Sequence, residues 1–309
     1  MQILDSAQTA ARLPFDKLIP AIEKIFQGEC AVPRRHIHTL PGDGDTANTL
    51  LIMPAWVEGQ YLGIKHVTVY PGNGRQGLPG LHSTYTLFDV RNGRPLAFID
   101  GDQITVRRTA AASALAARFL AKKNARRLLV VGAGNVASAL APAYAAVRDI
   151  AEVKVWNHAH AKAEALAGKL REQGFSAQAI PDLEAGVREA DIVTCATLSK
   201  APLIRRAWLR PGTHVDLIGG FTPEMRESDD AMYGDTSVFV DTDEALDKAG
   251  DLLSPMAAGV LKRADVLATL EGLCRRKHPG RTSEDEITVY KCVGNACEDL
   301  AAAVLAYQS

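Results

Sequence analysis

Short runs in which apolar residues dominate, or alternate with polar ones, recur through the first third of the chain. Turn-forming segments such as Pro71-Gly-Asn-Gly74 separate them, and Asn92-Gly93 between two apolar runs predicts a tight β-hairpin. The first part of the chain should therefore form an α+β unit with a largely antiparallel or mixed sheet. Its predicted strands are residues 50–53, 61–69, 83–88 and 96–99.

The pattern changes after a long alanine-rich helix, which we predict over residues 105–122. From residue 128 onwards, short apolar runs alternate with segments of helical period. Regular alternation of strand and helix implies an α/β fold with a parallel, doubly wound sheet. The predicted strands are residues 128–131, 153–156, 177–180, 191–196, 214–219 and 237–240, and the predicted helices include residues 161–173 and 183–189.

A glycine-rich turn follows the first of these strands. Gly132 and Gly134 are spaced as in a dinucleotide-binding turn, and the small residue Ala137 takes the place of a third glycine. The first glycine permits a tight turn, and the second lets the backbone approach a pyrophosphate. The helix that opens with Asn135 and Val136 would offer free N–H groups and a partial positive charge to the phosphates. The second part of the chain is thus expected to be a Rossmann-type, NAD(P)-binding domain.

The last predicted helix, residues 294–307, should return to the first domain and make that domain discontinuous. We therefore expect the first domain to comprise residues 1–119 and 286–309. The Rossmann-type domain is expected over residues 120–285.

The end of the second Rossmann strand bears on the choice of cofactor. Sheets specific for NAD usually carry an aspartate or glutamate there, which binds the ribose hydroxyls. Here the strand runs into Asn157 and His158 with Lys162 nearby, so no acidic residue is present. These side chains could hold a 2′-phosphate, which favours NADPH. The alternative is a plain surface turn with NADH accepted.

Composition and charge narrow the class of protein. The formal net charge is −1, so nothing indicates a nucleic-acid or membrane partner. The five cysteines form no CxxC pair and no metal motif, which indicates reduced thiols and no metal site. Residues 128–147 are uncharged, but their strand-then-helix pattern favours the nucleotide fold over a membrane span. No secretory signal is visible, so we expect a cytoplasmic protein.

Some side chains could have a catalytic or binding role, and for each a purely structural role is the alternative. Arg108 lies near the start of the alanine-rich helix, where a guanidinium suits the helix dipole poorly; it could clamp a ligand carboxylate or form an ordinary salt bridge. Lys65 lies in an apolar strand and could face either solvent or a cleft, where it would act as a proton donor. His82 is ambiguous in the same way, since a lone histidine is more often structural.

Together these segments resemble the ornithine cyclodeaminase/μ-crystallin family over nearly the whole chain. The arginine-threonine pair at the helix start and the C-terminal Lys-x-x-Gly element are specific to that family. The matching segments are Gly63-Ile-Lys65, residues 100–116, Gly132-Ala-Gly134, residues 208–214, residues 250–253, residues 288–294 and Glu298-Asp299.

The resemblance implies a homodimer whose first domain holds the substrate and the subunit interface. It implies that Arg35, Lys65 and Arg108 surround the substrate carboxylate, with Val293 and Gly294 near the substrate. His82 is a weaker substrate-binding candidate, on its residue type alone. The resemblance also places a further group of residues near the cofactor: Thr84, Thr109, Thr197 and Cys292.

One departure from the family is informative. Ornithine cyclodeaminases and related alanine dehydrogenases carry an aspartate directly after the glycine turn, followed by Pro-Gly-Lys, whereas this chain has Phe221 in the aspartate position and Met225 in the lysine position. Cyclodeamination needs that carboxylate as a base, and a phenylalanine cannot accept a proton. Phe221 can only shape the substrate pocket. The chain therefore resembles the branch that reduces cyclic ketimines and carries a Phe-Thr-Pro segment.

The expected activity is thus NAD(P)H-dependent reduction of Δ1-pyrroline-2-carboxylate or Δ1-piperideine-2-carboxylate, giving L-proline or L-pipecolate, as part of proline metabolism. Arg108 would clamp the carboxylate, and Lys65 or a water that it orders would keep the ring nitrogen protonated. Three alternatives stay open. They are an ornithine (or lysine) cyclodeaminase or amino-acid dehydrogenase with another base, an NADPH-dependent binding protein of the μ-crystallin type, and an oxidoreductase of unknown substrate.

Overall fold

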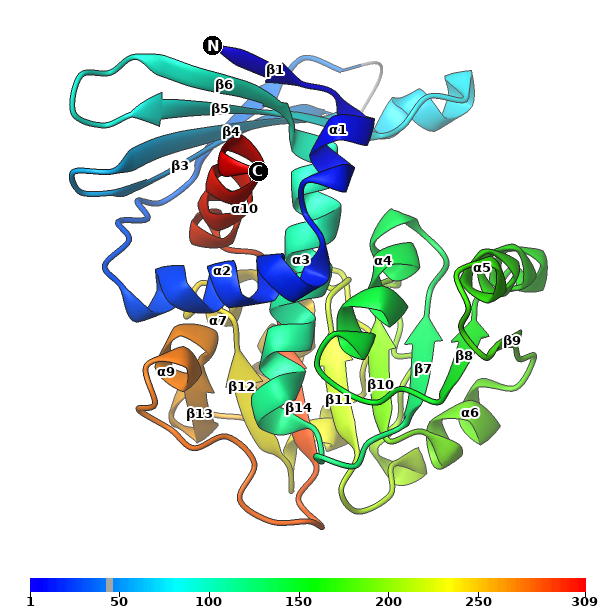
Figure 1. The fold of residues 1–309 in the computed structure, drawn as a ribbon. Coiled ribbons are helices and arrows are strands. Elements are labelled where there is room, and N and C mark those ends of the chain that lie inside the picture. The colour runs from blue at the N-terminus through cyan, green and yellow to red at the C-terminus, as the bar shows by residue number, and fades with distance from the viewer. Residues whose placement is uncertain (43–46) are drawn as a thin grey trace. The chain divides into compact units, whose positions relative to one another are not determined.

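A computed structural model describes residues 1–42 and 47–309, which fall into two compact units (Figure 1). Unit 1 comprises Met1–Thr109 and Asn295–Ser309, and unit 2 comprises Ala110–Gly294. These limits differ from the expected ones at 119/120 and 285/286. The second half of helix α3 (Gly101–Leu120) and the strand β14 (Thr288–Lys291) both lie within unit 2.

Unit 1 is built on a six-stranded sheet in the order β1-β6-β5-β4-β3-β2. Strand β1 pairs with β6 in parallel, and the other neighbours are antiparallel, which confirms the mixed sheet. Asn92 and Gly93 lie in the hairpin between β5 and β6, where Gly93 has a φ of 72°. The strands are β1 (Gln2–Leu4), β2 (His36–Leu40), β3 (Asn48–Val57), β4 (Tyr61–Val69), β5 (Leu81–Asp89) and β6 (Pro95–Asp100).

The helices of unit 1 bury one face of this sheet. Helix α2 (Phe15–Gln27) buries Leu18, Ile22 and Phe26, which recur at helical spacing. Helix α10 (Ala296–Gln308) packs against α2 and strands β3 to β6 (Figure 1). Asn295 caps its start in a capping box with Glu298. The remaining short helix is α1 (Ser6–Ala11) and a 3-10 turn spans η1 (Pro71–Gln76).

The opposite face of the sheet, here called the open face, carries both apolar and polar side chains and is partly exposed. The register aligns Ile3, Phe98, Thr86, Ile64 and Pro54 in one row across β1, β6, β5, β4 and β3. Ile3 is 69% and Phe98 41% exposed. These residues share a face because residues directly opposite each other in neighbouring strands point to the same side of the sheet.

Unit 2 contains an eight-stranded sheet in which every pair is parallel, so the predicted Rossmann-type fold is confirmed. The order is β13-β12-β14-β11-β10-β7-β8-β9. The strands are β7 (Arg127–Val131), β8 (Glu152–Trp156), β9 (Ala177–Ala179), β10 (Ile192–Cys195), β11 (His214–Leu217), β12 (Ser237–Val240), β13 (Val266–Thr269) and β14.

The strand order reverses between β7 and β10. Helices α4 (Asn135–Ala145) and α5 (His160–Glu172) carry the chain outward from β7, and α6 (Leu183–Glu189) returns it. Right-handed crossovers then place α6 on the other face of the sheet. In folds of this type, ligands bind at the carboxyl ends of the strands beside such a reversal. The other helical segments are η2 (Arg206–Trp208), η3 (Asp230–Tyr233), α7 (Ala245–Lys248), α8 (Gly250–Ala257), η4 (Arg263–Asp265) and α9 (Leu270–Cys274).

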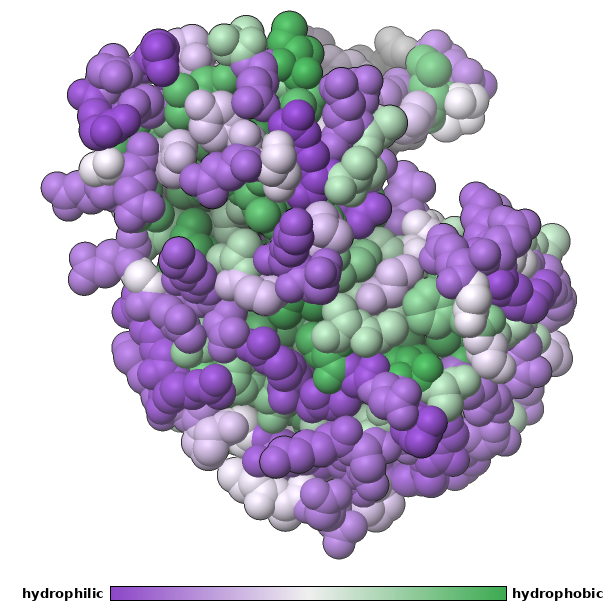
Figure 2. Space-filling view, viewed as in Figure 1, coloured by the Kyte–Doolittle hydropathy of each residue, from purple (hydrophilic) through white to green (hydrophobic). Residues whose placement is uncertain are grey.

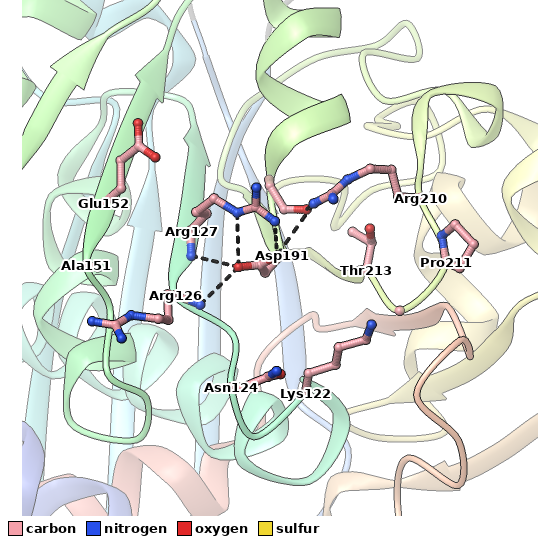
Figure 3. Close-up of a pocket in the computed structure, with 12 residues that line it drawn as sticks. Lys122, Asn124, Arg126, Arg127, Ala151, Glu152, Asp191, Arg210, Pro211 and Thr213 are labelled. Carbon is pink, nitrogen blue, oxygen red and sulfur yellow. Dashed lines mark hydrogen bonds and ion pairs between the residues drawn. The ribbon is translucent and has the colours of Figure 1, made fainter.

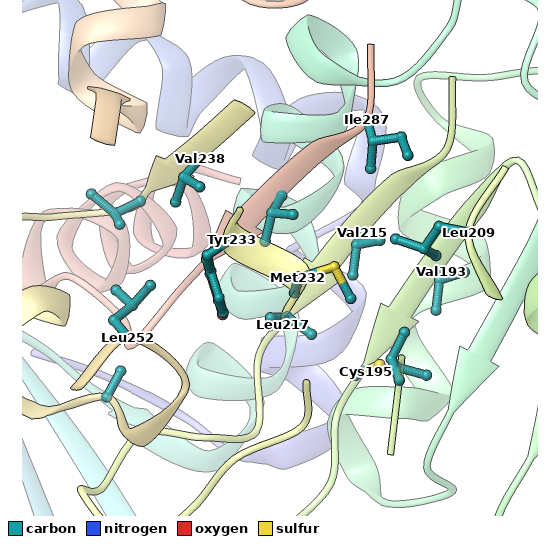
Figure 4. Packing of buried hydrophobic residues seen from close by; sticks show 14 of the residues in the cluster. Val193, Cys195, Leu209, Val215, Leu217, Met232, Tyr233, Val238, Leu252 and Ile287 are labelled. Carbon is teal, nitrogen blue, oxygen red and sulfur yellow. The ribbon is translucent and has the colours of Figure 1, made fainter. Parts of the chain in front are cut away.

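One hydrophobic cluster of unit 2 lies on one face of this sheet (Figure 4). Val193 and Cys195 of β10 share that face with Val215 and Leu217 of β11, because residues two apart on a strand point the same way. Met232, Tyr233, Leu209 and Leu252 cover them. Figure 2 shows hydrophilic side chains over much of the visible surface of unit 2. No helix of the described part of the chain is long and apolar enough to cross a membrane.

Candidate active site

Lys65 lies on the buried face of the unit 1 sheet and not toward solvent. Its side chain is 2% exposed, and its Nζ lies 2.7 Å from Asp299 Oδ2 on helix α10. Nζ also donates to Thr105 Oγ1 at 3.4 Å. A lysine that loses its hydration this fully needs a counter-charge, and Asp299 supplies it.

Arg108 is buried on helix α3, and two carboxylates of helix α10 bind it. Its Nε donates to Asp299 Oδ1 and its Nη1 donates to Glu298 Oε2, both at 2.8 Å. Both carboxylates lie in the first turn of α10, where the helix dipole favours negative charge. Asp299 therefore joins Arg108 to Lys65, and the guanidinium plane is fixed by two separate contacts.

The charged groups of this cluster shift one another's pKa values. Burial lowers the pKa of Lys65 to about 8, Asp299 opposes that shift, and Arg108 and Arg35 add to it. Burial alone would raise the pKa of Asp299, but Lys65 and Arg108 hold it below its usual value. Arg35 is thus close enough to act on Lys65. Glu298 and Asp299 pair with Lys65 and Arg108, so the formal charges of these four groups balance.

Two further predicted residues lie elsewhere in unit 1. His66 is opposite Thr84 and Thr68 is opposite His82, whereas Lys65 is opposite Tyr85. Because neighbouring residues on a strand point to opposite faces, Thr84 and His82 lie on the open face, away from Lys65. The structure does not bring them into the cluster. Thr109 is buried beside Arg108, and its expected contact with the cofactor stays a prediction.

The glycine turn of unit 2 fits a dinucleotide. At Gly132, φ is 115°, and a Cβ would lie 2.4 Å from the carbonyl oxygen of Ala196, so packing alone requires glycine there. At Gly134, a Cβ would meet nothing within 4 Å. Packing therefore does not explain the second glycine, whereas room for a pyrophosphate does. No side chain caps helix α4, whose first turn holds Asn135 and Val136 with N–H groups available to phosphate.

The turn after β8 has the features that the sequence predicts. Gly132 N–H donates to the carbonyl of Trp156, which fixes the end of β8 beside the glycine turn. Asn157 Nδ2 donates to the carbonyl of Ala159, and His158 is exposed. Residues 157–162 include no aspartate or glutamate that could bind ribose hydroxyls. The contacts of Asn157 and His158 with a cofactor stay predictions.

Thr197 and Phe221 lie in the loops that follow β10 and β11. Thr197 donates its N–H and its hydroxyl to Glu227 Oε1, at 2.7 and 2.8 Å. Phe221 is 44% exposed in the turn after Gly220. Both residues are at the carboxyl end of the sheet, where the fold binds ligands.

The segment after β14 is held by a carboxylate that the sequence analysis did not single out. Asp241 follows β12, is buried, and accepts the N–H groups of Val293 and Gly294 through Oδ2, at 2.7 and 2.6 Å. Cys292 is buried and donates its N–H to the carbonyl of Leu217. The predicted substrate-side turn thus has a defined backbone. Its roles toward a ligand stay predictions.

A separate cavity of about 540 Å³ opens at the amino-terminal edge of the same sheet (Figure 3). Asp191 accepts the N–H groups of Arg126 and Arg127 at 3.0 Å, forms an ion pair with the Arg127 side chain at 2.6 Å and lies 3.5 Å from Arg210. These contacts brace the starts of β7 and β10. The cavity lies at the wrong end of the strands for a dinucleotide, and we assign it no catalytic role.

Sequence analysis missed the acidic partners of this site. Glu298 and Asp299 matched the family, but nothing in the sequence indicates that they pair with Lys65 and Arg108. Asp241 was missed although it directly follows an apolar strand, which is a usable signal. Among the residues that the structure describes, no group of His, Cys, Asp and Glu side chains could hold a metal ion.

Comparison with known proteins decides the family. The sequence profile of the ornithine cyclodeaminase/mu-crystallin family matches residues 3–309. The chain belongs to this family. It is 41% identical to a Delta(1)-pyrroline-2-carboxylate reductase of Paracoccus denitrificans over 289 residues, which covers 91% of this chain and 89% of the relative.

Solved structures agree with this family over the full length. The Thermococcus litoralis Delta(1)-pyrroline-2-carboxylate reductase in complex with NADH and L-proline superposes with a TM-score of 0.93 at 30% identity, covering 100% of this chain and 97% of that one. An archaeal alanine dehydrogenase dimer with bound NAD gives a TM-score of 0.91 at 30% identity, covering 100% and 95%.

Proposed function

We propose that this protein reduces a cyclic ketimine, Δ1-pyrroline-2-carboxylate or Δ1-piperideine-2-carboxylate, to L-proline or L-pipecolate, with NADPH as the preferred reductant. The observation that carries the proposal is the buried cluster of Lys65, Arg108, Glu298 and Asp299 with Arg35 close by. The coarser assignment, an NAD(P)H-dependent oxidoreductase acting on a C=N bond, is confirmed by the relatives named above.

The cluster has the groups that the reaction needs. Arg108 and Arg35 would bind the substrate carboxylate, and Asp299 keeps the Arg108 guanidinium oriented for that contact. Lys65 has a pKa of about 8, so it carries a proton at neutral pH and can still donate it near the ring nitrogen. The nicotinamide supplies a hydride to the imine carbon when it is bound. One hydride and one proton then convert the C=N bond to an amine.

Phe221 supports reduction over cyclodeamination. A cyclodeaminase must deprotonate an amine and then protonate the leaving ammonia, and a carboxyl group can serve as the base in the first step and the acid in the second. The side chain of Phe221 is apolar and partly exposed, and it offers no acceptor. The reduction of a cyclic ketimine keeps the ring nitrogen and releases no ammonia, so it has no such requirement.

The preference for NADPH rests on the turn after β8. Asn157 and His158 replace the acidic residue that binds ribose hydroxyls in NAD-specific sheets, and Lys162 is exposed nearby. The neighbouring structures contain NADH or NAD, so NADH is the competing cofactor that a test must include.

We also propose that the protein is a homodimer that associates through the open face of the unit 1 sheet. Ile3 and Phe98 are large apolar residues exposed in one row of that face. Apolar surface of this kind is normally covered in an assembly. One of the neighbouring structures is a dimer.

The test is NADPH oxidation, followed by absorbance, with each ketimine in turn and NADH in parallel. An L-ornithine control tracks the release of ammonia. Lys65→Met should abolish most of the turnover, while Lys24→Met, on helix α2, serves as the matched control and should leave it unchanged. No turnover of either ketimine by the wild-type protein would refute the proposal.

A further inference from the structure

The loops after β10 and β11 touch through their backbones. A Cβ on Gly219 would lie 1.9 Å from the carbonyl oxygen of Thr197 and 2.6 Å from its nitrogen. Only glycine allows this approach. The two loops therefore meet at the carboxyl edge of the sheet and cannot move independently without breaking the contact.

Glu227 fastens the two loops together. Its Oε1 accepts the N–H and the hydroxyl of Thr197, and its Oε2 accepts the N–H of Gly219 at 2.7 Å. The side chain is fully buried. One carboxylate thus supplies acceptors for both loops, and the N–H of Arg226, which donates to the carbonyl of Ser199 at 2.9 Å, joins the same loops.

A second buried pair supports this carboxylate from behind. Asp251 Oδ1 accepts the N–H groups of Glu227 and Ser228, at 2.7 and 3.0 Å. Asp251 Oδ2 forms an ion pair with Lys291 Nζ at 3.2 Å, and neither side chain is exposed. Burial raises the pKa of Glu227 to about 7, and Lys291 opposes that shift. Burying charged side chains such as Glu227, Asp251 and Lys291 lowers stability unless they are fully paired. Charges buried in this way are therefore expected to serve a function or to be completely paired.

The fastened loops display two apolar side chains. Leu198 directly follows Thr197 and is 72% exposed, and Phe221 lies two residues after Gly219 and is 44% exposed. We propose that Glu227 is a positioning residue, which holds the loops bearing Leu198 and Phe221 in the one arrangement that accepts the dinucleotide and the ketimine. This inference rests on the proposed function.

Unit 2 offers a matched control for mere stability. Asp191 also accepts two backbone N–H groups, from Arg126 and Arg127, and also braces neighbouring strands. It does so at the amino edge of the sheet, away from the expected ligand. A bracing carboxylate at either edge should matter to stability, whereas only Glu227 should matter to ligand affinity.

The experiment compares Glu227→Gln with Asp191→Asn. Glutamine keeps the shape but turns an NH2 group toward N–H donors. The Kd of NADPH, measured by its fluorescence without any ketimine, should rise by at least about tenfold, the scale of a lost hydrogen bond to a charged group. Asp191→Asn should lower the melting temperature and leave that Kd within about twofold. Because no turnover is measured, the result stands even if the protein reduces neither ketimine.

If the protein turns over a ketimine, comparing the change in KM with the change in kcat gives a second measurement. Glu227→Gln should raise KM as well, because Phe221 shifts with its loop. If the glutamine variant does not fold, Glu227→Asp decides, since it keeps the charge but is one methylene too short to reach both loops. A folded variant at position 227 with an unchanged Kd for NADPH would overturn the proposal, and so would an equal rise in Asp191→Asn.

Discussion

Lys65 and Asp299 are separated by most of the sequence, yet Nζ and Oδ2 lie 2.7 Å apart and both side chains are buried. Asp299 also accepts Nε of Arg108. One carboxylate thus sets both the charge of the lysine and the orientation of the arginine. The pH dependence of the protein should therefore follow this pair.

Replacing the carboxylate should shift that pH dependence. If Lys65 must carry its proton, kcat/KM of the wild-type protein falls as the pH rises through about 8, the pKa of this lysine. Asp299 raises that pKa, so Asp299→Asn lowers it and moves the basic limb of the profile to lower pH. The measurement is kcat/KM for the ketimine against pH.

Asp102→Asn is the control for this shift. Asp102 is also in unit 1, on helix α3, where its Oδ1 accepts the Ser83 hydroxyl at 2.6 Å. It should leave the basic limb in place. An Asp299→Asn profile that superposes on the wild-type profile would remove Lys65 as the proton source.

The fold could be predicted where its cause is local. The local pattern of apolar and polar residues predicts the strands of unit 1 and the alternation of strands and helices in unit 2. The structure confirms both. Strand β14, which inserts between β11 and β12, was not predicted. Its sequence is short and contains Lys291, so it does not form an apolar run. Helix α2 was overlooked although Leu18, Ile22 and Phe26 show the helical spacing.

The site could be predicted less completely, for a physical reason. Lys65 and Arg108 match a family motif, so the sequence proposes them as site residues, and their roles stay predictions. Whether a lysine on an alternating strand faces solvent or a buried carboxylate depends on what packs on that face, and here it is helix α10 from the far end of the chain. Glu227 is equally hidden, because its partners Thr197 and Gly219 come from other loops.

Arg108→Lys should impair catalysis more than cofactor binding. Lysine keeps the charge but cannot contact Glu298 and Asp299 while presenting a bidentate edge to a carboxylate. Activity should fall by at least roughly tenfold, while NADPH still binds. Arg107→Lys is the control, since Arg107 stacks on Phe15 and donates to the carbonyl of Leu13. Near-normal turnover of Arg108→Lys would exclude Arg108 from the site.

The two glycines of the turn should respond differently to alanine. Gly132→Ala puts a Cβ on a residue with φ of 115° and 2.4 Å from the carbonyl oxygen of Ala196, so the free energy of unfolding should fall by about 1–3 kcal/mol. Gly134→Ala meets open space, so it should fold normally but bind NADPH more weakly. Thermal melts and NADPH fluorescence separate the two effects. Unweakened binding in Gly134→Ala would contradict a pyrophosphate at this turn.

An acidic residue after β8 should change the preferred cofactor. Asn157→Asp would repel a 2′-phosphate and accept ribose hydroxyls, so the ratio of kcat/KM for NADPH over NADH should fall. Asn124→Asp adds the same charge at the amino edge of the sheet and should leave the ratio unchanged. A wild-type protein that strongly selects NADH would show that the turn of Asn157 and His158 does not bind a phosphate.

The reaction type depends on Phe221. An aspartate at this position would offer a proton acceptor for deamination, whereas the phenylalanine here offers none, and we propose that it shapes the substrate pocket. We expect the wild-type protein to reduce at least one of the two ketimines and to release no detectable ammonia from L-ornithine. Phe221→Asp should impair imine reduction, because it adds a carboxylate without the rest of a deaminase site.

Phe221→Asn separates charge from size in this test, since asparagine has the shape of aspartate without its charge. If the charge is what harms imine reduction, kcat/KM falls further in Phe221→Asp than in Phe221→Asn, because a carboxylate beside the bound substrate carboxylate is repelled. Equal losses would mean that the lost apolar contact matters instead. Ammonia and proline formed from ornithine by the wild-type protein would overturn the assignment, whatever the variants do.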